Sequence, residues 1–211
     1  MKLISVNIGI PREVEWNGST VTTGFFKSPV KGPVAVRRLN IDGDRQADLT
    51  VHGGESKAVY VYPTEHYEFW RNELPEMELP WGMFGENFST EGLSEESVNI
   101  GDSFKVGTAE FIVTEPRMPC YKLNVRFSRP DMVKRFMASR RSGFYFRVSK
   151  EGEVNPGDTI ESLSEDKEGV SVADIITLYA FDRGNLDLWK KVSKAEALPE
   201  SWQSYFRHHF E

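Results

Sequence analysis

Short runs of β-branched and aromatic residues, separated by turns, dominate the first 165 residues and limit the fold more than any other feature of the chain. The dipeptide Asn17-Gly18 lies between two such runs and is typical of the tight turn of a β-hairpin. Residues 58–62 form an apolar run without charge, which predicts a buried strand. Many short strands at this spacing predict a closed β-barrel or a β-sandwich.

Residues 170–211 carry a different pattern, with three helix signals separated by short breaks. Short connections favour antiparallel neighbours, so we expect a three-helix bundle here. About forty residues bury too little apolar surface to be stable alone, so this bundle should pack against the rest of the chain. We therefore predict a first domain over residues 1–165, with helices inserted after Pro63 and at Pro130, a polar linker over 161–169, and this C-terminal module.

Charge is distributed unevenly along the chain. The whole protein has a formal net charge of −6, which argues against general nucleic-acid binding. Residues 117–150 nevertheless contain ten Lys or Arg and one acid, Asp131, a local charge of +9. A positive region in an acidic protein favours one bound anion, although part of it must be an ordinary solvated helix face.

Cysteine content and hydropathy limit where the protein is expected to work. A single cysteine excludes an intramolecular disulfide and predicts a reducing compartment, the cytoplasm. No apolar run approaches the ~18 residues that cross a bilayer, so no membrane segment is expected. The first residues have no signal-peptide core and are typical of a strand.

The single cysteine, Cys120, lies at the start of the positive segment, in Pro116-Arg117-Met118-Pro119-Cys120. The two prolines restrict the backbone that leads to the sulfur. Nearby cations favour the thiolate, which is both a nucleophile and a soft metal ligand. Most lone cysteines are small buried hydrophobic residues, so the residues alone support a functional and a structural role about equally.

A second candidate is the loop His52-Gly53-Gly54, which is followed by Lys57 just before the apolar run. Paired glycines let the backbone approach a ligand and present N–H groups to an anion. A tight turn with a structural His52 explains the same residues, and by itself that explanation is the better one.

Three further positions carry polar side chains where packing does not require them. Lys27-Ser28 lies where a strand meets a turn, and such a pair commonly contacts phosphate. Asn87, in the segment Gly85-Glu86-Asn87-Phe88, could direct an amide into a site. Arg147 is predicted to lie on a buried strand, where a cation normally requires an anionic partner.

Taken in order along the chain, these segments resemble the MOSC family, the molybdenum cofactor sulfurase C-terminal domains. The resemblance rests on Lys27-Ser28, His52-Gly53-Gly54 with Lys57, Gly85-Glu86-Asn87-Phe88, Pro116-Arg117 with Pro119-Cys120, and Gly143-Phe144-Tyr145 with Arg147. It covers essentially the whole chain and is greatest for the branch of the family that has a C-terminal three-helix module. Ser56 stands where an acid is expected, which leaves the details of the substrate open.

The resemblance implies a closed β-barrel with helical modules around a positively charged cavity that binds the molybdenum cofactor, a phosphorylated pterin. Cys120 would be the protein ligand to molybdenum. The implied phosphate and pterin contacts are Lys27, Ser28, Lys57, Arg117 and Arg147, the backbone of His52, Gly53 and Gly54, and the side chain of Asn87. His52 would deliver a proton, since histidine changes its charge near neutral pH.

The resemblance also implies an activity, the reduction of N-hydroxylated compounds such as N-hydroxylated purine bases, and so the detoxification of base-analogue mutagens. Electrons would come from a separate flavin-dependent reductase. The chain itself shows no flavin or nicotinamide motif, and pyridoxal phosphate is not expected. Small molecules, rather than nucleic acids or membranes, are the expected partners.

Two other functions fit the same residues. Cys120 could be a covalent nucleophile in sulfur or acyl transfer, with His52 as its base. The protein could also carry a pterin or the molybdenum cofactor without catalysing a reaction. Metal retention, a persulfide or acyl adduct on Cys120, and binding without turnover distinguish the three.

Overall fold

The computed structural model describes residues 1–47 and 53–210, and of Phe210 the backbone alone. The strands are β1 (Lys2–Ile8), β2 (Arg12–Trp16), β3 (Ser19–Thr23), β4 (Ser28–Pro29), β5 (Val34–Arg37), β6 (Asn40–Ile41), β7 (Val59–Pro63), β8 (Phe88–Glu91), β9 (Ser103–Val106), β10 (Ala109–Pro116), β11 (Phe144–Lys150), β12 (Gly152–Val154) and β13 (Ile160–Ser164). The helices are α1 (Glu65–Glu73), α2 (Tyr121–Phe127), α3 (Met132–Ser139), α4 (Val172–Ile176), α5 (Leu186–Val192) and α6 (Glu200–Phe210), with a 3-10 turn η1 (Glu55–Lys57) and a π-helical turn η2 (Thr177–Phe181).

Eight strands form one mixed sheet in the order β13-β9-β10-β11-β7-β8-β1-β4. β7 and β8 are parallel, whereas their neighbours in the sheet are antiparallel. The order has two ends, β13 and β4, so the sheet is open and the predicted closed barrel is wrong. In the described part of the chain, β1 and the segment before β13 meet at one isolated bridge, Lys2 with Thr159, and its neighbouring backbone hydrogen bonds, whereas a barrel needs a continuous ladder all the way round.

Two local predictions about strands are confirmed. β2 and β3 form the hairpin predicted around Asn17-Gly18, with Trp16 opposite Ser19. Asn17 and Gly18 have φ values of 50° and 75°, as the favoured two-residue turn requires at both positions. The apolar run at 58–62 gives β7, and all of β7 is buried.

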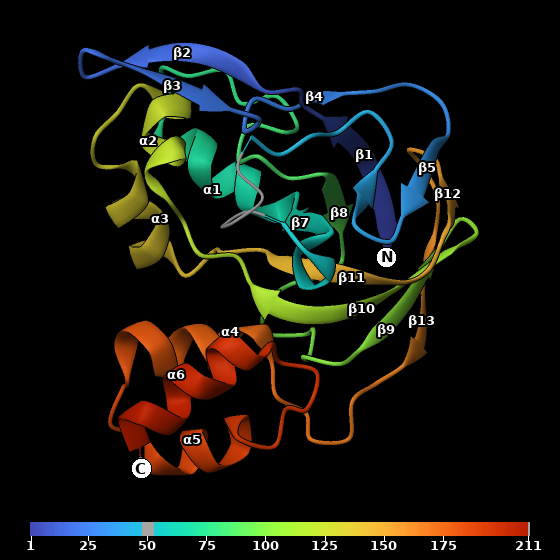
Figure 1. Ribbon diagram of the computed structural model, residues 1–211, viewed down its shortest axis with the longest axis vertical. Helices are drawn as coiled ribbons and strands as arrows, with labels where there is room; N and C mark the ends of the chain where they lie inside the picture. The colour runs from blue at the N-terminus through green and yellow to red at the C-terminus, as the bar shows by residue number, and fades with distance from the viewer. Residues whose placement is uncertain (48–52, 211) are drawn as a thin grey trace.

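Buried apolar side chains form two clusters. The larger cluster lies on the sheet and continues into the C-terminal helices, and the smaller, more aromatic one lies among α1, α2 and α3. Figure 1 shows α1 to α3 grouped on one side of β10 and β11, and α4 to α6 grouped on the other. The sequence does not predict α2, because Leu123, Val125 and Phe127 alternate with polar residues as in a strand.

The C-terminal helices are joined to the sheet through side chains and backbone. Val172, Ile175 and Trp202 belong to the same buried cluster as the sheet. Val172 N donates to Val98 O at 3.0 Å, and Ala173 N donates to the backbone carbonyl of Glu95 at 2.9 Å. The division into residues 1–165 and 170–211 stays a prediction, but in the structure the module packs against the sheet and is no free tail.

The predicted linker over residues 161–169 is partly structured. Its first part extends β13, which pairs with β9, and its next part is held by a hydrogen bond from Asp166 N to Asp102 Oδ1 at 2.8 Å. Strand pairing at the sheet edge has therefore ordered a polar segment that composition alone presents as a loop. Within the described residues, no helix has the length and apolar character that crossing a bilayer requires.

Candidate functional site

A cavity lies where the ends of several strands meet the start of α2. It brings together five of the predicted site residues, namely Lys27, Lys57, Asn87, Arg117 and Cys120. They come from the segment before β4, from η1, from the loop before β8, and from the connection between β10 and α2. Segments that are distant in sequence thus supply one positively charged cavity.

Cys120 is half-buried on the wall of this cavity and directly precedes α2. Its carbonyl oxygen accepts a hydrogen bond from Leu123 N at 2.9 Å, so the first turn of the helix fixes the cysteine backbone. Pro116 ends β10 opposite Phe144, and the segment between that strand and the helix is therefore short and anchored at both ends. The sulfur is held in place at the cavity without being sealed in the core.

Arg117 is the most unusual group in the cavity, because its guanidinium is buried and the described residues give it no counter-ion. The residue is 3% exposed, and its guanidinium lies 5.3, 5.2 and 5.1 Å from the ring centres of Phe25, Tyr60 and Phe136. In the described part of the chain, its Nη1 also has no hydrogen-bond partner. Rings compensate a buried cation in part, but an unpaired guanidinium in a cavity is suited to an anionic ligand.

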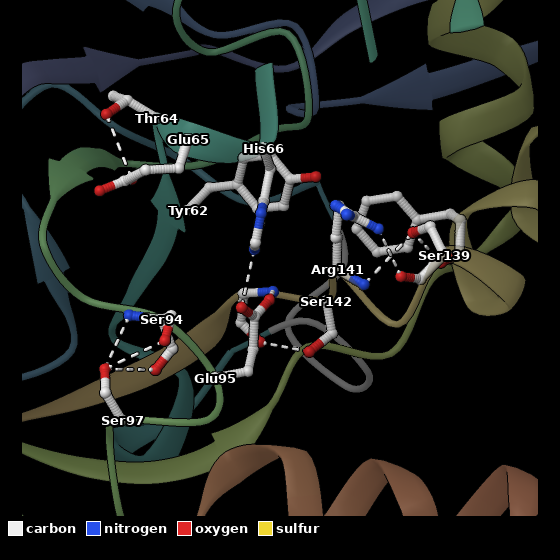
Figure 2. Close-up of polar contacts among 12 residues, drawn as sticks. Tyr62, Thr64, Glu65, His66, Ser94, Glu95, Ser97, Ser139, Arg141 and Ser142 are labelled. Atoms are coloured by element: carbon white, nitrogen blue, oxygen red, sulfur yellow. Dashed lines mark hydrogen bonds and ion pairs between the residues drawn. The ribbon is translucent and has the colours of Figure 1, made fainter. Parts of the chain in front are cut away.

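A turn behind Arg117 keeps this residue in place. Arg117 N donates to Gly143 O at 3.2 Å, and Gly143 N donates to Glu95 Oε1 at 2.6 Å. The other carboxylate oxygen of Glu95 lies 2.7 Å from His66 Nε2, and Figure 2 shows His66 pointing at Glu95 with Ser142 beside it. Gly143 has a φ of 63°, and a Cβ there would lie 2.4 Å from Val61 O, so this turn requires glycine.

Lys27 and Asn87 line the cavity, but both already have protein partners. Lys27 Nζ lies 2.5 Å from Asp44 Oδ2, and Asn87 Nδ2 donates to the same oxygen at 2.9 Å. Burial lowers the pKa of Lys27, while the Asp44 carboxylate opposes that shift. Asn87 Oδ1 accepts from Tyr60 N at 3.1 Å. In the structure these two side chains shape the cavity, and their capacity to bind a ligand directly is small.

Lys57 and Lys122 also line the cavity, and the described residues supply neither side chain with an ion pair or a hydrogen bond. Lys122 is 8% exposed, so its ammonium lies along the cavity wall rather than in bulk solvent. Tyr145 lies nearby, and burial raises its pKa to about 12 against the opposing effect of Arg117. Among the described residues, the cavity therefore presents four cations that form no ion pair, Arg45, Lys57, Arg117 and Lys122, and a neutral phenol.

The remaining predicted site residues lie elsewhere. Ser28 and Arg147 are exposed, and neither lines this cavity. Gly53 and Gly54 form the turn before η1, in which Gly54 O accepts from Lys57 N at 3.1 Å, and they do not line the cavity either. His52 lies outside the described residues.

Several residues of this region were missed by sequence reasoning. Lys122 follows Cys120 by two positions, in a segment that carries the family resemblance, but no site role was predicted for it. Tyr60 and Tyr145 are ordinary strand residues in sequence, and Glu115 and Trp202 become neighbours only through the docking of the C-terminal helices. These contacts are long-range, and no local pattern predicts them.

The buried guanidinium gives a direct test. We expect Arg117→Met to weaken the binding of inorganic phosphate by roughly 10- to 150-fold, because a hydrogen bond to a charged group contributes about 1.5–3 kcal/mol. The folded protein should be as stable as the wild type or more stable, because methionine fills the space among the rings without an unpaired charge. Calorimetric titration and thermal unfolding measure the two effects.

Arg71→Met is the matched control, since Arg71 is exposed on α1 and does not line the cavity. It should change neither phosphate affinity nor the melting temperature. Equal losses of phosphate affinity in the two variants would mean that Arg117 is not the anion-binding group.

Comparison with known proteins shows which family the chain resembles in sequence. The family model described as the MOSC domain matches residues 48–161. The YflK protein of Bacillus subtilis is 42% identical over 97% of this chain and 92% of its own length, and Protein YiiM of Escherichia coli is 34% identical over 85% of this chain and 81% of its own. A protein of Gibberella moniliformis named Reductase is 41% identical over 69% of this chain, a match that spans 26% of that protein.

Solved structures give the same result. The crystal structure of YiiM from Geobacillus stearothermophilus superposes with a TM-score of 0.84 at 33% identity, covering 100% of this chain and 99% of that one. That of YiiM from Escherichia coli gives 0.75 at 28% identity, covering 99% and 92%. Both similarities extend through the C-terminal helices as well as the sheet. The chain therefore belongs to the MOSC domain family.

Proposed function

We propose that this protein is a molybdenum-cofactor-dependent reductase of N-hydroxylated compounds, with N-hydroxylated purine bases among its substrates. It would work in the cytoplasm, in a detoxifying role, and receive electrons from a separate flavin-dependent reductase. The family and the relatives, one of which is named a reductase, fit a molybdenum-related reductase in broad terms. The observation that carries the proposal is that two functional groups share one cavity. The guanidinium of Arg117 is buried and has no carboxylate partner among the described residues. The half-buried thiol of Cys120 lines the same cavity.

The residues present fit such a cofactor. Molybdenum prefers soft sulfur donors, and Cys120 provides the one thiol of the chain. The phosphate of the pterin requires charge-assisted donors, and Arg117, Lys57 and Lys122 are available for it. When bound, the cofactor supplies the two-electron chemistry that cleaves an N–O bond.

The protein side of the mechanism follows from the geometry. Arg117, Lys57 and Lys122 hold the anionic end, and Lys27, held by Asp44, forms part of the cavity wall. Tyr145 keeps its proton at physiological pH and can donate a hydrogen bond into the cavity. We retain His52 as the proposed proton donor, with Ser28, Gly53, Gly54, Asn87 and Arg147 as proposed contacts that have less support from their positions.

The test is reconstitution of the purified protein with molybdenum cofactor, followed by metal analysis and turnover with a chemical reductant. We expect about one bound molybdenum per chain and conversion of an N-hydroxylated purine to the corresponding amine. A persulfide on Cys120 in a metal-free protein would instead establish the sulfur-transfer function. Tight cofactor binding without turnover, under any reductant, would indicate that the protein is a cofactor carrier.

A further inference from the structure

A second cavity adjoins the first, and Arg117 does not line it. The two cavities share Lys57, Met118, Cys120 and Tyr145 on their walls. Cys120 therefore lies between a cationic cavity and a cavity with several aromatic side chains on its wall. A small molecule in the second cavity would lie next to whatever group the thiol holds in the first.

Aromatic side chains from the C-terminal helices make one wall of this second cavity. Tyr179, Trp202 and Tyr205 all line it. The ring of Tyr179 lies 5.2 Å from that of Trp202 and 5.0 Å from that of Tyr205, at interplanar angles of 71° and 48°. Tyr179 and Tyr205 are only partly buried, so each ring keeps exposed surface beside its ring contacts, which for Tyr205 include His209 at 4.1 Å.

The same cavity is also lined by a buried carboxyl group, that of Glu115. Its Oε2 accepts a hydrogen bond from Trp202 Nε1 at 2.7 Å, and the described residues supply no hydrogen bond to its Oε1. Burial raises the pKa of Glu115, whereas Lys57 and the Trp202 hydrogen bond oppose that rise. Among the described residues, Oε1 thus has no protein donor, and it lies on the wall of a cavity.

A β-bulge places Glu115 on that wall. The register of β10 against β11 shifts between Val113 and Glu115, so Val113 lies opposite Phe146 while Glu115 lies opposite Tyr145. Paired residues share a face of the sheet, and Phe146 points into the core. The extra residue therefore places Glu115 on the face of Tyr145 rather than on the core face, and both residues line the second cavity.

We infer that the second cavity binds the substrate as a flat, nitrogen-containing aromatic ring, stacked on the rings of the C-terminal helices, with an N–H edge donated to Glu115. This rests on the proposed function, since the bound ring would present its N-hydroxyl group toward Cys120. Aromatic rings recognise the face of a base, and a carboxyl oxygen without a donor recognises an N–H group on its edge. The C-terminal helices are then the part of the chain that selects aromatic over aliphatic substrates.

The test uses adenine as the probe with the full-length protein, both free of cofactor and loaded with it. Calorimetry should show one adenine site, and bound adenine should slow the alkylation of Cys120 by iodoacetamide. Tyr205→Leu should weaken adenine binding roughly 5- to 150-fold, the usual range for loss of one base–aromatic stack. Glu115→Gln should weaken it as well, because the amide can still accept from Trp202 but presents N–H donors to the ring edge.

Phe181→Leu is the matched control, since Phe181 belongs to the same module, is 40% exposed and lies outside the cavity. It should leave adenine affinity unchanged. Thermal unfolding of every variant identifies losses that arise from misfolding. Absence of adenine binding in both protein forms, or equal affinity in a folded Tyr205→Leu or Glu115→Gln variant, would overturn the inference. Adenine binding needs no turnover. A failure of the molybdenum reconstitution would therefore count against the proposed function and not against this ring-binding site.

Discussion

Replacing Cys120 with serine is expected to abolish the retention of molybdenum and the reductase activity together. A serine oxygen is a hard ligand, whereas molybdenum prefers soft sulfur donors. The residue is half-buried and small, so the free energy of unfolding should change by about 1 kcal/mol or less. Metal analysis after reconstitution and gel filtration measures the loss, and circular dichroism measures the fold.

Met118→Leu is the matched control for this prediction, because the Met118 thioether is a second soft sulfur on the walls of both cavities. It should retain molybdenum and activity. If instead the leucine variant lost the metal and Cys120→Ser kept it, the assignment of the protein ligand would be wrong.

Removing the chain after Glu168 should destabilise the protein more than any of these single substitutions. Val172, Ile175, Leu178, Trp202 and Phe206 are buried in the same cluster as the sheet. Each such side chain contributes about 1.5–3 kcal/mol by burial, and a domain has a net stability of about 5–15 kcal/mol. The truncated protein should lose its cooperative unfolding transition and bind neither phosphate nor adenine with wild-type affinity.

A milder variant separates packing from the polar link between the two parts. Trp202→Phe keeps most of the apolar surface but removes the hydrogen bond to Glu115. It should remain folded, with a loss of about 1–3 kcal/mol for the carboxyl oxygen left without a donor. If the truncated protein were instead soluble, cooperative and active with its natural electron donor, the helices would be an independent module and the shared core would have no role in the site.

The parts of the fold and of the site that the sequence predicts are those with local signals. The Asn17-Gly18 turn dictates its hairpin through backbone conformation alone, and that hairpin is confirmed. Arg117 and Cys120 lie in one short segment with two prolines, and both line the cavity. The order of several such short motifs was enough to identify the family.

Side-chain direction on strands could be predicted only in part. Phe144, Phe146 and Val148 are apolar and alternate, so period-two geometry already implies that Arg147 points away from the core. The bulge in β10 reverses the same rule for Glu115, and nothing in its local sequence marks the extra residue. The direction of Arg147 was therefore predictable from the sequence, whereas that of Glu115 required the structure.

Long-range pairing set the remaining limits. Whether a sheet closes depends on contacts between its first and last strands, and the sequence does not reveal that β13 ends the sheet. The partnership of Lys27 with Asp44 depends likewise on two loops that meet in space. In the sequence Lys27 looks available to phosphate, but in the structure its charge is already balanced by Asp44.

The position of Cys120 on a wall common to two cavities has a consequence for the order of events. A molecule on one side does not have to leave before the other side is filled or emptied. Under the proposed function, a large anionic group would stay in the first cavity through many reaction cycles while small molecules enter and leave the second. Long-term retention and rapid exchange would then use separate cavities, with the one thiol of the chain on the wall common to both.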